Sequence, residues 1–94
     1  MPRLTPIIKR EQVSGDALTA FDAIIESRNS INGPHSMMMY APEVARCSTA
    51  LSDSLRFGGN LSDHDTELAI ITAARHWDCA YVWVSHSPAA LGAG

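Results

Sequence analysis

The sequence is poor in cysteine, in excess positive charge and in long apolar runs, and each shortage excludes a class of protein. Two cysteines, Cys47 and Cys79, are too few for the disulfide framework of a small secreted scaffold. A net charge of −3 provides no basic surface for nucleic acid. No apolar run approaches the roughly 20 residues that span a bilayer, and the N-terminus lacks the apolar segment of a signal peptide. We therefore expect a cytoplasmic protein with no nucleic-acid or membrane partner.

The chain is also short, and its length bounds its stability. Its 94 residues allow one small domain, expected over residues 1–94. A chain of this size buries only about 60% of its unfolded surface, so it needs additional stabilisation. With no disulfide framework, self-association is the favoured source.

Strand-like alternation is absent, and apolar residues recur instead at spacings of three and four, which predicts an all-α fold. Residues 1–13 are expected to form an extended arm. A helix capped by Ser14 is expected to run to Arg28, followed by a loop over 29–34. A second helix is expected to begin at Pro42 and to end at Gly58, with its packing face along Val44, Ala45, Ser48, Leu51, Ser52 and Leu55.

Two further helices are expected in the last third of the chain. The first begins at Ser62, which forms a capping arrangement with Asp65. After a short turn at 76–78, Asp78 is expected to cap the second, which runs from Cys79 through His86. Pro88 is expected to kink or break that helix. A short turn makes the two helices an antiparallel pair, around which the small domain is built.

Glu67, Cys79 and His86 bring a carboxylate, a thiol and an imidazole into these otherwise apolar helices. On a regular helix, Cys79 and His86 share one face, two turns and roughly 10 Å apart. Antiparallel packing allows Glu67 to face that side. An imidazole oriented by a carboxylate can act as a general acid or base near neutral pH. The three residues are therefore the candidate catalytic group.

Each of the three also has a structural interpretation. Glu67 can stabilise the start of a helix, Cys79 can be a packed thiol, and His86 can be a core histidine or a cation at a helix end. Two roles are open for the run Met37–Met39. Core or subunit packing is favoured over a role as the wall of a substrate pocket. Candidate pocket residues are Met38, Val82 and Trp83. The sequence contains no convincing metal-ligand spacing, and we expect no metal and no cofactor.

The arrangement resembles the carboxymuconolactone decarboxylase family, which includes the alkylhydroperoxidase D-like proteins. Its redox members have a glutamate, a cysteine twelve residues later, a second cysteine three residues on and a histidine four residues after that. Glu67, Cys79 and His86 match in type and spacing, whereas Val82 replaces the second cysteine. Further similar phrases lie between about residue 21 and the end: Phe21-Asp22-Ala23-Ile24, Gly33-Pro34, Ala41-Pro42-Glu43, Leu55-Arg56-Phe57 and Ala89-Ala90-Leu91.

The resemblance implies a helical fold that assembles as trimers or hexamers, and one of two chemistries. One branch reduces peroxides with a cysteine pair, and the other decarboxylates a carboxymuconolactone. Because Val82 cannot form a disulfide with Cys79, the replacement of the second cysteine favours a lyase that uses Glu67 and His86 on a small carboxylated substrate. The alternatives are a peroxidase that uses Cys79 alone and a catalytically silent module that oligomerises. Similar family members continue beyond residue 94, which favours a chain truncated at its C-terminus.

Overall fold

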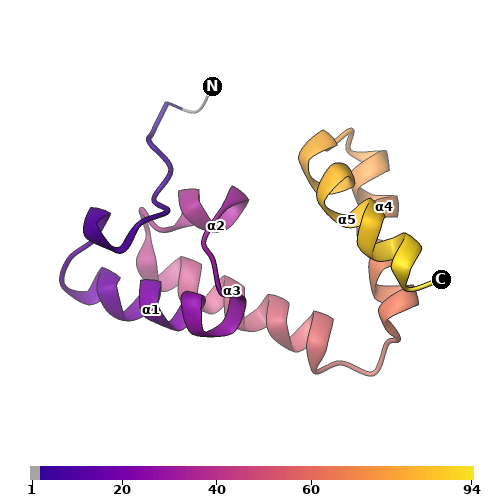
Figure 1. Cartoon of the computed structure of the whole chain (residues 1–94), viewed down its shortest axis with the longest axis horizontal. Coiled ribbons are helices and arrows are strands. Elements are labelled where there is room, and N and C mark those ends of the chain that lie inside the picture. The colour runs from indigo at the N-terminus through magenta and orange to yellow at the C-terminus, as the bar shows by residue number, and fades with distance from the viewer. Residues whose placement is uncertain (1–2) are drawn as a thin grey trace. The chain divides into compact units, whose positions relative to one another are not determined.

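The computed structural model describes residues 3–94, and all regular structure within that range is helical (Figure 1). After the 3₁₀ turn η1 (Arg10–Gln12) come α1 (Asp16–Arg28), α2 (Gly33–Met38), α3 (Pro42–Phe57), α4 (Asp63–His76) and α5 (Ala80–Gly92). The expected all-α class is confirmed. None of the helices among these residues is both long and apolar enough to cross a membrane.

The chain divides into two compact units, Met1–Leu55 and Arg56–Gly94. The first contains η1, α1, α2 and most of α3, and the second contains the last turn of α3 together with α4 and α5. Each unit is described separately below.

The first unit has a small apolar core to which most of its elements contribute. The N-terminal arm contributes Ile7, and the buried cluster is completed by Ala20, Phe21, Ile24, Ile31, Met39 and Ala45. The arm is fastened by two hydrogen bonds, from the Ile7 amide to the Ser36 carbonyl at 3.1 Å and from the Tyr40 hydroxyl to the Thr5 carbonyl at 2.8 Å. Residues 3–13 therefore take part in the packing of this unit.

Helix α1 begins one residue later than expected. Gly15, not Ser14, is its N-cap, and Gly15 adopts a positive φ of 58° that a residue with a side chain rarely takes. The helix ends at Asn29, which has a left-handed φ of 64° and whose amide bonds the Ile25 carbonyl. Asparagine tolerates this conformation better than most residues do. The sequence thus located the helix but not its cap.

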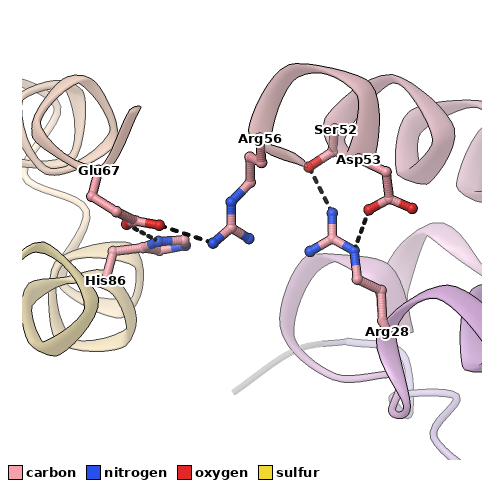
Figure 2. Close-up of polar contacts among 6 residues, drawn as sticks. All are labelled: Arg28, Ser52, Asp53, Arg56, Glu67 and His86. Atoms are coloured by element: carbon pink, nitrogen blue, oxygen red, sulfur yellow. Dashed lines mark hydrogen bonds and ion pairs between the residues drawn. The ribbon is translucent and has the colours of Figure 1, made fainter. Parts of the chain in front are cut away.

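Helix α3 has the expected bounds, but only part of its predicted face packs, because Ala45 is buried and Ser48 and Ser52 are half-buried. Ala45 and Thr49 are buried, whereas Val44, Leu51 and Leu55 are more than half exposed. The polar side of the helix is held against α1, because Arg28 donates to Asp53 at 2.6 Å and to Ser52 at 2.8 Å (Figure 2). That ion pair turns the larger apolar side chains away from the core.

Helices α4 and α5 pack against each other to form the second unit. The expected cap of α4 is confirmed, since the Ser62 hydroxyl accepts a hydrogen bond from the Asp65 amide at 3.1 Å. The expected cap of α5 is wrong, because Cys79 is the N-cap in place of Asp78, which takes a positive φ of 52° in the turn. Pro88 does not break α5, which continues to Gly92. The fixed φ of proline is compatible with a helix, although proline lacks one backbone N–H donor.

The core of the first unit yields a test of this packing. Ile24 is 1% exposed, so Ile24→Ala should lower the free energy of unfolding by about 2–5 kcal/mol. The matched control is Ile8→Ala, because Ile8 is half exposed and the same truncation there should cost about 0.5 kcal/mol or less. Urea unfolding followed by circular dichroism measures both, and equal losses would contradict the core described here.

Candidate functional site

Glu67 is the buried charged group of the second unit. It lies in the second turn of α4 with 7% of its surface exposed. The Ser62 cap sets where α4 begins, and the helical repeat then places Glu67 on the same side as Ala74, which faces α5. A carboxylate in this position needs partners, since burying an unpaired charge is costly.

His86 is the first partner of this carboxylate. Its Nδ1 lies 2.8 Å from Oε2 of Glu67 (Figure 2). This contact brings the start of α4 to the second half of α5, so the two helices run antiparallel. An ionised carboxylate can only accept hydrogen bonds, so Nδ1 carries the proton of this bond. In the neutral ring Nε2 is then the basic nitrogen.

Arg56 is the second partner. Its Nη2 donates to Oε1 of Glu67 at 3.0 Å, so the two carboxylate oxygens are used by two different side chains. Figure 2 shows that the side chains of His86 and Arg56 both reach the carboxylate of Glu67. Arg56 comes from the last turn of α3, and its guanidinium also lies 5.0 Å from the Phe57 ring centre. Nothing in the spacing along the sequence connects Arg56 to Glu67, so this contact emerges only from the structure.

The electrostatics of the cluster favour an ionised Glu67. Burial alone acts to raise the pKa of this carboxyl group, but the hydrogen bonds from His86 and Arg56, together with their charges, outweigh it. The net result is a pKa below the ordinary value of 4.5. At neutral pH the cluster therefore contains a negatively charged Glu67 carboxylate bonded to the His86 imidazole and the Arg56 guanidinium.

A small depression opens beside this cluster. It has a volume of about 290 Å³ and is lined by Arg56, Phe57, Asp63, Thr66, Glu67, Ala89, Gly92 and Ala93. Two of its lining residues have buried polar atoms without a hydrogen-bond partner, namely Nε of Arg56 and Oγ1 of Thr66. Small residues at the end of α5 keep the depression open. Its volume is suited to a small molecule.

Cys79 lies apart from this cluster. It is half-buried and lines a different depression of about 370 Å³, together with Ala74, Arg75, Asp78, Ala80 and Trp83. His86 is not part of that lining, as expected for residues two helical turns apart. The structure thus brings together two of the three candidate catalytic residues, Glu67 and His86, and leaves the thiol among different neighbours.

The candidate pocket residues also fall in different places. Val82 is half-buried on α5, and Trp83 lines the depression next to Cys79. Met38 belongs to the first unit, where it packs against the apolar core. This position agrees with the packing interpretation of the methionine run.

Comparison of the chain with protein-family models, with curated proteins and with solved structures finds no match. Within residues 3–94, no group of three or more His, Cys, Asp or Glu side chains could hold a metal ion. The functional interpretation therefore depends on the cluster itself.

The lowered pKa of Glu67 predicts a pH dependence of stability. A carboxyl group whose pKa is depressed by folding stabilises the folded state above its ordinary pKa, and this contribution is lost as the pH falls through the folded-state value. Glu67→Gln should therefore lower the stability of the second unit by about 1–3 kcal/mol at pH 7 and flatten its decline at acid pH. Tryptophan fluorescence reports this unit, because Trp77 and Trp83 both lie in it. Asp65→Asn, an exposed change on the same helix, should keep the decline, and loss of the decline there would contradict the assignment.

Proposed function

We propose that the chain is a carboxymuconolactone decarboxylase-like lyase that uses acid–base chemistry on a small carboxylated substrate. The observation that supports it most is the 2.8 Å contact between Nδ1 of His86 and the buried Glu67 carboxylate. A histidine held in one tautomer by a buried carboxylate is a common arrangement for proton transfer. The spacing of Glu67, Cys79 and His86 is the resemblance on which the proposal rests, and Val82 in place of the second cysteine is what favours the lyase over the peroxidase.

In the proposed reaction the bond between the substrate carbon and its carboxylate breaks, and carbon dioxide leaves. The electron pair of that bond passes into the conjugated lactone, and a proton is then required at carbon. Protonated His86 donates this proton from Nε2 and afterwards regains one from water. Nδ1 stays bonded to Glu67 throughout, so the ring keeps its orientation.

Glu67 and Arg56 act through His86 in this proposal. Ionised Glu67 fixes the orientation of the His86 ring through Nδ1, and Arg56 keeps Glu67 ionised and restrains its second oxygen. Arg56 is thus a positioning residue. Arg56 is assigned this role because its Nη2 is bonded to the Glu67 carboxylate.

Cys79 has an accessory place in the proposal. With Val82 in the position of the second thiol, a peroxidase cycle would need one cysteine alone. In that cycle the Cys79 thiolate attacks a peroxide, an alcohol leaves, and an external thiol reduces the resulting sulfenic acid. No histidine lines the depression around Cys79 to assist the thiol, which disfavours this alternative.

A cytoplasmic location and a small-molecule substrate form part of the same proposal. Both cysteines are free, Cys47 exposed and Cys79 half-buried, as is usual for proteins in a reducing compartment. The third alternative, a catalytically silent module, predicts that changes at His86 alter stability or assembly without affecting any turnover.

Carbon dioxide release from a carboxymuconolactone is the direct test. His86→Ala should lower kcat by roughly 10²- to 10⁴-fold, as is typical when a general acid is removed. Cys79→Ser is the control and should leave kcat unchanged. Wild-type protein that releases no carbon dioxide would contradict the lyase, and peroxide consumption abolished by Cys79→Ser would support the peroxidase instead.

The role of Arg56 predicts a change in pH profile. Arg56→Met removes a group that lowers the pKa of Glu67, so the acid limb of kcat against pH should move to higher pH. Arg56→Lys preserves the positive charge and should move the limb less. A uniform loss of activity at all pH values in both variants would show that Arg56 acts only by supporting the fold.

A further inference from the structure

The depression beside Glu67 has two polar atoms in its wall that the fold leaves unpaired. Every residue that lines it lies in the second unit. Among residues 3–94, three buried side-chain polar atoms have no hydrogen-bond partner, and two of them, Nε of Arg56 and Oγ1 of Thr66, belong to this lining. Buried donors are nearly always satisfied in folded proteins, because an unpaired one is destabilising. Two such donors on one depression point to a ligand that carries a hydrogen-bond acceptor.

The charges around the depression determine which kind of acceptor fits. Nε and Nη2 share one edge of the planar guanidinium, and Nη2 of Arg56 already donates to Oε1 of Glu67 at 3.0 Å. An atom that accepts from Nε therefore lies close to the Glu67 carboxylate. Asp63 adds a second carboxylate to the lining, against the single guanidinium of Arg56. Since this excess of negative charge repels an anion, an uncharged oxygen fits better, and a carbonyl oxygen has the two lone pairs that two donors need.

We propose that the depression binds a small uncharged carbonyl group, whose oxygen accepts hydrogen bonds from Nε of Arg56 and Oγ1 of Thr66. The identity of the ligand rests on the proposed function, because a lactone carries an uncharged carbonyl in its ring. The ring carbonyl of the substrate then enters the depression, and its carboxylate stays outside, away from Asp63 and Glu67. The site thereby fixes which end of the substrate faces the cluster.

The depression has room for a small ring. Its volume is about 290 Å³, and its floor along α5 consists of the small residues Ala89, Gly92 and Ala93. A Cβ added at Gly92 would meet nothing within 4 Å, so the space extends over this residue. Entry requires a side chain at the rim to move, since both unpaired atoms are buried. Phe57 is that side chain, because its ring centre lies 5.0 Å from the Arg56 guanidinium and its 67% exposure allows the ring to turn outward.

An NMR titration tests the carbonyl site directly. The probe is γ-butyrolactone, an uncharged lactone, and the Nε–H signal of Arg56 is identified by its loss in Arg56→Lys. Addition of the lactone should move this signal in a saturable way, with a dissociation constant on the order of 10 mM for so small a ligand. Succinate, an anion of similar size, should bind at least roughly fivefold more weakly, because it would meet the carboxylates of Asp63 and Glu67.

The hydroxyl of Thr66 provides a matched pair of variants. Thr66→Val removes the second donor with little change of shape, so it should raise the dissociation constant of the lactone roughly fivefold. Because this hydroxyl is unpaired in the fold, the same change should leave the urea midpoint unchanged or raise it. The control is Thr72→Val on the same helix, since the Thr72 hydroxyl donates to the Leu68 carbonyl at 2.6 Å and lines no part of this depression. Lactone affinity should be unchanged in the control.

Four results would overturn the proposal. The Arg56 Nε–H signal could stay in place up to about 100 mM lactone, or succinate could bind more tightly than the lactone, which would identify an anion site. Equal weakening by Thr66→Val and Thr72→Val would remove the specific role of Thr66. A lowered urea midpoint in Thr66→Val would show that its hydroxyl is satisfied within the fold. All four are measured without turnover, so a protein that binds the lactone but releases no carbon dioxide would defeat the lyase and leave the carbonyl site standing.

Discussion

Burial of the Glu67 carboxylate is the constraint on which the second unit depends. Glu67 keeps only 7% of its surface exposed, so its negative charge needs partners nearby. His86 and Arg56 supply them through two hydrogen bonds. The first bond joins α4 to α5 and the second joins α4 to the last turn of α3. Removing either partner would leave the charge partly unpaired, so the cluster constrains how these three segments pack.

The same constraint determines which chemical groups surround the carboxylate. The Glu67 carboxylate divides its oxygens between two different side chains, with Oε1 bonded to the Arg56 guanidinium and Oε2 to the His86 imidazole. The depression next to Glu67 gives small molecules a place near the cluster. Cys79, which looked equivalent to the other two residues in the sequence, has no part in this network.

A second feature of the structure is that several apolar side chains are exposed. In α3, Leu51 and Leu55 turn outward because Arg28 holds the polar side of the helix through Ser52 and Asp53. In α5, Tyr81, Val84 and Leu91 are exposed, whereas Val82 and His86 lie on the half-buried side toward α4. Periodicity identifies an apolar stripe but not the surface that it meets, which is why only part of the predicted face of α3 packs.

The sequence by itself determined the helical class, the bounds of α3 and α4 to within a residue and the Ser62 cap, because these depend on local signals such as Pro42 and Gly58. It also identified Glu67 and His86 as partners, since a short turn between two helices leaves little choice of arrangement. Only the tertiary structure decided that Arg56 completes the cluster, that Cys79 lies outside it and that α5 continues past Pro88. These outcomes depend on which side chains meet across helices and on how a whole helix tolerates one missing hydrogen bond, and neither is encoded in spacing along the chain.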